Sequence, residues 1–313
     1  MVAIPLAHLS WAIADNAQRK ACDAWVIDTF GAETCFEILI TPENENLGMD
    51  REEKLMLIGD TMLIPIAPAG PGLLPQSPTG EMLRRSAGAN RWLGVALRVA
   101  DIAAAAAWFE AKGFKLHYDP GMEAIYFLIG RKQVLGVRIE VLAQDLPNDP
   151  RIAPGWNPMR WRDDHPLGIE GLQSIGVSTP SLDAARALFA ERLEWPELGS
   201  RDLPGEAAQC LAFAMGDTVI EAMCPSDPGS DLARHLAEMQ GIWCLTFKVR
   251  SAEAAAAHLK AKGFALVGDV ASRFAIRPDQ ACERLIWFTD HEVPGYPPLG
   301  SKLREPARFA KAG

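Results

Sequence analysis

The stretch Trp92-Leu-Gly-Val-Ala-Leu-Arg-Val99 decides the fold, because the chain contains a second version of it. It is followed by an alanine-rich segment, residues 102–110, and then by Lys112-Gly-Phe114. The second version is Gly241-Ile-Trp-Cys-Leu-Thr-Phe-Lys-Val249, and it precedes another alanine-rich run and Lys262-Gly-Phe264 at the same spacing. A strand, a helix and a glycine stop that recur half a chain apart indicate a tandem duplication.

A second repeated motif divides each half again. Gly59-Asp-Thr61 and Gly216-Asp-Thr218 are turns that lead into similar apolar strands. Apolar periodicity and turn residues predict strand-helix-strand-strand-strand modules over about residues 4–67, 91–143, 171–224 and 241–290. The predicted fold class is therefore α+β, with four βαβββ modules in two tandem halves.

Some elements of these modules are weakly marked in the sequence. Residues 42–53 predict a polar loop in the first module. In the third module the apolar runs place strands at residues 171–177, 208–215 and 219–223, with a helix from Ser181 to about residue 193.

Proline-rich segments suggest the domain boundaries. We expect an N-terminal half at residues 1–145, a linker at 146–168, a C-terminal half at 169–292 and a tail at 293–313. The linker contains Trp156 and Trp161, which we expect to hold it against a domain surface. Residues 68–90, rich in Pro, Gly and Ser, predict a connection with one short helix near residues 81–85.

Composition excludes several classes of partner. The net charge of −9 without a basic cluster argues against nucleic acid and anionic membranes. No segment approaches the roughly 18 apolar residues that a membrane span needs, and the N-terminus lacks the basic region of a signal peptide. The six cysteines show no C-x-x-C spacing, so we expect reduced thiols in a cytoplasmic protein. The expected partners are a small-molecule substrate and, in a homodimer, a second copy of the chain.

The sequence also lacks the common catalytic motifs. No G-x-G-x-x-G, P-loop, H-E-x-x-H or G-x-S-x-G occurs in a usable context. Nucleotide chemistry and serine-nucleophile chemistry therefore find no support.

The repeated module resembles the vicinal oxygen chelate superfamily, which contains glyoxalases, extradiol dioxygenases and bleomycin-resistance proteins. The resemblance covers residues 4–290 and rests on the opening strands, the Lys-Gly-Phe motifs and closing strands such as Val137-Arg-Ile-Glu-Val-Leu142. It implies that two modules pair so that their curled sheets form a half-open cup. It also implies a divalent metal on the cup floor, held by side chains of the first and last strands of each paired module.

The resemblance assigns eight candidate ligand positions to this chain. In module order they are His8 and Ile64, Gly94 and Glu140, Ser174 and Glu221, and Cys244 and Trp287. His8, Glu140 and Glu221 are the implied metal ligands, because imidazole and carboxylate suit Fe²⁺, Mn²⁺, Zn²⁺ or Ni²⁺. If the first two modules pair, His8 and Glu140 share one cup and Glu221 lies in the other.

Each implied ligand also has a simpler interpretation. A buried histidine such as His8 is commonly satisfied by a backbone carbonyl. Glu140 shares a strand face with Arg138, so the two can form an ion pair. Glu221 has no charged neighbour on its own strand face, and an unpaired buried carboxylate is costly, so it either faces solvent or has a function. Cys244 is interpreted as an apolar filler.

Two further histidines are candidate catalytic residues. His117 stands beside Tyr118 on a predicted strand and is either a pocket-rim general base or a surface residue. His291 follows the last predicted strand and is placed at the mouth of the fourth module, with a solvated position as the alternative.

The favoured function is a small-molecule enzyme with metal-assisted lyase or isomerase chemistry on an apolar or aromatic oxygenated substrate. An extradiol ring-cleaving dioxygenase is one alternative, although no cup shows the set of two histidines and one carboxylate that such iron sites use. A metal-free ligand-binding protein is the other, because five of the eight ligand positions lack a standard ligand.

Overall fold

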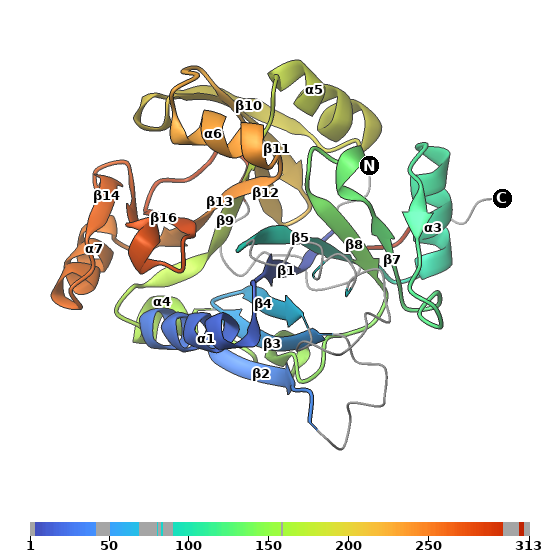
Figure 1. Cartoon of the computed structure of the whole chain (residues 1–313), viewed down its shortest axis with the longest axis horizontal. Helices are drawn as coiled ribbons and strands as arrows, with labels where there is room; N and C mark the ends of the chain where they lie inside the picture. The colour runs from blue at the N-terminus through green and yellow to red at the C-terminus, as the bar shows by residue number, and fades with distance from the viewer. Residues whose placement is uncertain are drawn as a thin grey trace.

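The computed structural model describes residues 4–41, 51–68, 80, 83, 90–157, 159–296 and 307–309. Two eight-stranded sheets, one from each half of the chain, lie side by side in the molecule (Figure 1). The expected fold class is confirmed, because each half contains two βαβββ modules in one mixed sheet. Most of the expected short helix near residues 81–85 and most of the tail at 293–313 lie outside the described residues.

The N-terminal half contains the first two modules. Module one consists of β1 (Leu6–Ala12), α1 (Asn16–Phe30), β2 (Glu33–Ile38), β3 (Arg51–Ile58) and β4 (Thr61–Pro68). Module two consists of β5 (Arg91–Arg98), α3 (Ile102–Ala111), β6 (Leu116–His117), β7 (Tyr126–Ile129) and β8 (Arg138–Leu142). The 3₁₀ turn η2 (Arg131–Gln133) lies between β7 and β8, and η3 (Pro150–Ile152) and α4 (Arg160–Asp164) follow β8.

The C-terminal half repeats the same order. Module three consists of β9 (Ile169–Ser178), α5 (Leu182–Arg186) with its π-helical continuation η4 (Ala187–Arg192), β10 (Glu197–Leu203), β11 (Ala208–Met215) and β12 (Thr218–Pro225). Module four consists of β13 (Ile242–Val249), α7 (Ala252–Ala261), β14 (Leu266–Asp269), β15 (Arg273–Ile276) and β16 (Leu285–Thr289). The remaining elements are η5 (Pro204–Glu206), α6 (Asp231–Glu238) and η6 (Pro278–Gln280).

The helix boundaries follow from capping residues. Asp15 accepts a hydrogen bond from the backbone N–H of Gln18 and begins α1, and Gly31 ends it with a left-handed φ of 64°. Asp101 caps α3 and Ser251 caps α7 in the same way. A side-chain oxygen at this position satisfies a backbone N–H that the first helical turn leaves without a partner.

The pairing of modules places the candidate site. In the N-terminal sheet the strand order is β2-β3-β4-β1-β5-β8-β7-β6, so modules one and two join through antiparallel β1 and β5. The C-terminal sheet has the equivalent order and joins through β9 and β13. The four central strands of each sheet are therefore the first and last strands of the two modules.

A β-bulge interrupts the central pairing of each sheet at the same place. Leu6 pairs with Leu97 and His8 with Ala96, so Ala7 is an extra residue in β1. Leu172 pairs with Phe247 and Ser174 with Thr246, which makes Gln173 the extra residue in β9. Bulges of this kind change the direction of side chains and are common beside functional sites.

Packing joins the two halves. One cluster of buried apolar residues contains side chains from both sheets. Phe30 of α1 has its ring centroid 6.0 Å from that of Phe288 in the other half. The indole of Trp161 in the linker is buried and donates a hydrogen bond to the Phe30 carbonyl at 3.2 Å, which fastens the linker to the N-terminal half.

Two segments differ from the sequence expectation. Residues 51–53 belong to β3 rather than to a polar loop, and β10 forms where no strand was expected. Both stretches are polar, because β10 is the edge strand of its sheet and β3 turns charged residues toward a cavity. In the described ranges, no helix is long and apolar enough to cross a bilayer.

Candidate functional site

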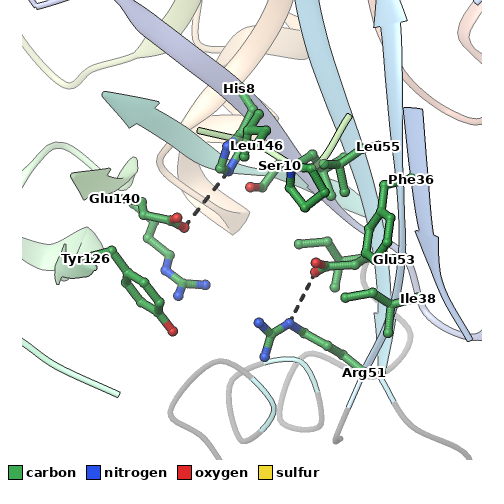
Figure 2. A pocket seen from close by; sticks show the side chains of 14 residues that line it. His8, Ser10, Phe36, Ile38, Arg51, Glu53, Leu55, Tyr126, Glu140 and Leu146 are labelled. Atoms are coloured by element: carbon green, nitrogen blue, oxygen red, sulfur yellow. Dashed lines mark hydrogen bonds and ion pairs between the residues drawn. The ribbon is translucent and has the colours of Figure 1, made fainter. Parts of the chain in front are cut away.

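The N-terminal cup contains a cavity of about 150 Å³ between its two modules (Figure 2). The polar side chains that line it are His8, Ser10, Arg51, Glu53, Tyr126, Arg138 and Glu140. The apolar lining consists of Phe36, Ile38, Leu55, Ile64, Ile66, Leu146 and Pro147. The cavity therefore combines an apolar wall with several charged groups.

His8 and Glu140 meet on the floor of this cavity. Ala96 of β5 pairs with His8 on one side and with Glu140 on the other, so both side chains stand on the same face of the sheet with one strand between them. His8 Nε2 lies 3.9 Å from Glu140 Oε2. The small methyl group of Ala96 leaves the space in which the two side chains approach each other.

The imidazole of His8 is neutral at pH 7. Its pKa is lowered to about 4, mainly by burial and also by nearby Arg151 and Arg138, whereas Glu53 raises it. Within the described part of the chain, His8 Nδ1 has no hydrogen-bond partner. The alternative of a histidine satisfied by a backbone carbonyl is therefore not what the structure shows.

Glu140 is an unusually basic carboxylate. Burial raises its pKa, while Arg138 and Arg51 oppose that shift. Arg138 precedes Glu140 by two residues on β8 and shares its strand face, as the sequence suggested. Arg51 Nε lies 3.2 Å from Glu53 Oε2 on the opposite wall (Figure 2). Two guanidinium groups thus line the cavity near the His8–Glu140 pair.

The His8–Glu140 pair fits a divalent ion only as a two-ligand site. Bonds of about 2.0–2.2 Å to nitrogen and oxygen would span the 3.9 Å between the two atoms only at a wide ligand–metal–ligand angle, so the side chains would have to move closer for tetrahedral coordination. Among the described residues, however, no group of three or more His, Cys, Asp or Glu can hold a metal. Gly94 occupies another ligand position, and a Cβ there would overlap the carbonyl oxygen of Arg138, because β5 and β8 run so close together.

The C-terminal cup contains a larger cavity, of about 330 Å³. Glu221 is fully buried on its floor and forms ion pairs with Arg201 of β10 and Arg273 of β15. Arg273 also pairs with Glu206 and stacks over Trp287, with its guanidinium carbon 4.9 Å from the ring centroid. The sequence showed no charge on the strand face of Glu221, because its partners come from the outer strands of the sheet. Metal binding by Glu221 stays a prediction.

The two candidate catalytic histidines lie away from the His8–Glu140 pair. His117 is exposed on β6 and lines a surface groove with Lys115, Arg131 and Lys132. His291 is exposed at the rim of the C-terminal cavity. Neither side chain lines the N-terminal cavity, and their catalytic roles stay predictions.

Sequence reasoning did not assign a role to the arginines of the two cups. Arg51 and Glu53 alternate at the start of β3, and this spacing of two could have identified a charged strand face. Arg201 lies on a polar edge strand that resembles a loop in the sequence. For Arg273 we find no local signal, because only the pairing of β15 beside β16 directs it into the cup.

Comparison with known proteins agrees with this architecture. Residues 173–277 match the family model described as the Glyoxalase/Bleomycin resistance protein/Dioxygenase superfamily. This segment belongs to that superfamily. The vicinal oxygen chelate resemblance expected from the sequence is thereby confirmed. No curated protein sequence matches the chain significantly.

Solved structures extend the vicinal oxygen chelate fold to both halves. A mutant of 4-hydroxymandelate synthase from Streptomyces coelicolor aligns with 94% of this chain and 96% of its own, at 13% identity and a TM-score of 0.66. Methylmalonyl-CoA epimerase from Mycobacterium tuberculosis aligns with 41% of this chain and 92% of its own, at 22% identity and a TM-score of 0.37. At these identities the likeness to 4-hydroxymandelate synthase shows a shared fold.

Proposed function

We propose that the N-terminal cup is the active site of an isomerase or lyase that moves a proton on a small oxygenated substrate with an anionic group. The observation that carries this proposal is the approach of His8 and Glu140 to 3.9 Å on the floor of a cavity that also contains Arg51 and Arg138. The superfamily match covers residues 173–277 of the C-terminal half, and the N-terminal sheet supports the proposal through its equivalent strand order.

The two arginines bind and orient the substrate. Guanidinium groups offer several N–H donors in a fixed plane, and they pair with carboxylate or enolate oxygens in two places at once. Arg138 precedes Glu140 by two residues on β8 and lines the same cavity. Arg51 lies on the opposite wall from Glu140 (Figure 2). The apolar side chains of Phe36 and Leu55 accommodate the remainder of the substrate and exclude water from it.

Glu140 is the proton-transfer group in this arrangement. A carboxylate whose pKa is raised by burial holds a proton more strongly and is a better general base. His8 is neutral, so its Nε2 lone pair is available as a metal ligand or a hydrogen-bond acceptor. A divalent ion held by His8 and Glu140 would polarise a substrate oxygen as a Lewis acid.

The test has a metal arm and a reaction arm. Protein purified without chelator is analysed for bound metal, and small 2-oxo and 2-hydroxy acids are examined by NMR for exchange of C–H protons in D₂O. We expect near-stoichiometric metal and exchange in the wild type, and loss of both in His8→Ala and Glu140→Gln. Glu253→Gln is the matched control for Glu140→Gln, because Glu253 is exposed on α7 in the C-terminal half. Background metal in all proteins together with no exchange on any acid would reject the proposal.

A metal-free binding protein is the second candidate function. It is favoured by Arg138 beside Glu140, because a guanidinium group competes with a cation for the same carboxylate. Binding of an oxygenated apolar ligand that survives EDTA, without exchange or turnover, would identify this function instead. Catechol-dependent oxygen uptake with added Fe²⁺ would identify the dioxygenase alternative.

A further inference from the structure

The C-terminal cavity has a floor of polar groups without protein partners. Gln173 Oε1, Ser174 Oγ and Thr246 Oγ1 are buried and, among the described residues, accept or donate no hydrogen bond. All three side chains line the cavity, on the adjacent strands β9 and β13. Buried polar groups in folded proteins nearly always have a partner, so this cluster needs an explanation.

The bulge in β9 places two of these groups on one face. Gln173 is the extra residue of the bulge, and for that reason it and its neighbour Ser174 both line the cavity instead of alternating. Gln173 Nε2 donates a hydrogen bond to the His291 carbonyl at 3.1 Å, which fixes the amide and leaves Oε1 as an acceptor. In the N-terminal half the equivalent residue is Ala7, which is buried against apolar side chains.

The arginines that line the C-terminal cavity are neutralised by ion pairs, and the exposed Glu292 at its rim adds one negative charge. Arg201 and Arg273 contribute two positive charges, and Glu206 and Glu221 contribute two negative charges with which they are paired. A charged ligand would have to break this network, because each guanidinium group already has a carboxylate. A neutral ligand would leave the network intact and still reach the unpartnered oxygens.

We propose that the C-terminal cup binds a neutral, hydroxyl-rich small molecule. Its hydroxyl groups donate to Gln173 Oε1 and exchange hydrogen bonds with Ser174 and Thr246, which satisfies all three buried groups at once. A volume of about 330 Å³ lies within the range of small-molecule sites. This site is separate from the His8–Glu140 pair and does not depend on the function proposed for it.

The first test measures the stability of the ligand-free protein. Thr246→Val removes an unpartnered buried hydroxyl at nearly constant volume, so we expect the melting temperature of dialysed protein to rise by a few degrees. Thr289→Val is the matched control in the same cavity. The Thr289 hydroxyl donates to the Ser272 carbonyl at 2.7 Å, and its loss lowers the melting temperature. A lower melting temperature in Thr246→Val would show that the hydroxyl already has a structural partner and would overturn the proposal.

The second test measures binding by titration calorimetry with myo-inositol, D-glucose and D-sorbitol, and with citrate as a polyanion. We expect at least one neutral compound to bind the wild type and to bind about tenfold more weakly to Gln173→Leu and Thr246→Val. His8→Ala should bind it unchanged, which separates this site from the N-terminal cup. Binding of citrate alone, of no compound, or binding that both cavity variants leave unchanged would overturn the proposal.

Discussion

At the scale of single residues, folding keeps the His8 imidazole neutral at pH values at which the unfolded chain would protonate it. In the unfolded chain the His8 imidazole has a pKa near 6.5, whereas in the folded protein its pKa is lowered to about 4, mainly by burial. The unfolded state therefore binds more protons between these values. The stability contributed by neutral His8 is fully present above about pH 6.5 and is lost as the pH falls toward 4.

This shift predicts an acid-sensitive fold. We expect the free energy of unfolding of the metal-free wild type, measured by urea titration in EDTA, to fall between pH 7 and pH 4.5. His8→Gln should lose less stability over the same range, because it has no imidazole whose protonation favours the unfolded state. Each unit by which folding lowers the His8 pKa corresponds to about 1.4 kcal/mol. His291→Gln changes an exposed histidine and serves as the control. Equal pH dependence in His8→Gln and the wild type would contradict this prediction.

At the scale of elements, the contact between β5 and β8 positions the candidate site. These strands run parallel, and Gly94 pairs with Arg138 so closely that a Cβ has no room. The same register pairs Ala96 with Glu140. The close approach of the two backbones thus explains the glycine at position 94, one of the ligand positions that the family resemblance implied.

We expect Gly94→Ala to lower the free energy of unfolding by roughly 1–3 kcal/mol, the usual cost of overpacking, because β8 must move away from β5. The movement should also weaken the metal binding proposed for Glu140, since this residue is carried with β8. Urea denaturation and metal analysis measure the two effects. Gly205→Ala is the control, because a Cβ there meets no described atom within 4 Å. A fully stable Gly94→Ala would show that β5 and β8 are not in close contact.

At the scale of the whole molecule, the two halves hold each other through reciprocal contacts. Asp60, in the Gly-Asp-Thr turn of the first half, accepts a hydrogen bond from the backbone N–H of Leu172 at 3.0 Å. Asp217, in the equivalent turn of the second half, accepts from the N–H of Leu6 at 3.0 Å. Leu6 and Leu172 occupy equivalent positions before the two bulges, so each half makes the same contact with the other.

Loss of either contact should destabilise the entire chain. We expect Asp60→Ala and Asp217→Ala each to lower the free energy of unfolding by about 1–3 kcal/mol, because a backbone N–H at the interface between the halves loses its acceptor. Asp279→Ala, at an exposed ion pair, should change it by less than about 0.5 kcal/mol.

Calorimetry checks a second consequence of this interface. The wild type should unfold in a single transition, because one apolar core contains residues of both halves. Two well-separated transitions in the wild type would show that the halves fold independently.

The sequence by itself determined the modules. Repeated Lys-Gly-Phe and Gly-Asp-Thr motifs and alternating apolar residues are local signals, and they predicted the four βαβββ units. The resemblance to the vicinal oxygen chelate superfamily then implied His8 and Glu140 as metal ligands. Local patterns fail for polar edge strands, and so the sequence assigned no strand to the segment around Arg201 and no β3 start at Arg51.

Only the tertiary structure decided which side chains meet. The β1–β5–β8 pairing brings His8 within 3.9 Å of Glu140, although the two residues lie far apart in the chain. In the other half, the outer strands β10 and β15 carry Arg201 and Arg273 onto Glu221. These contacts depend on the pairing of strands that are distant in the sequence and on the bulges that shift their register. Neither feature produces a periodic pattern in the sequence.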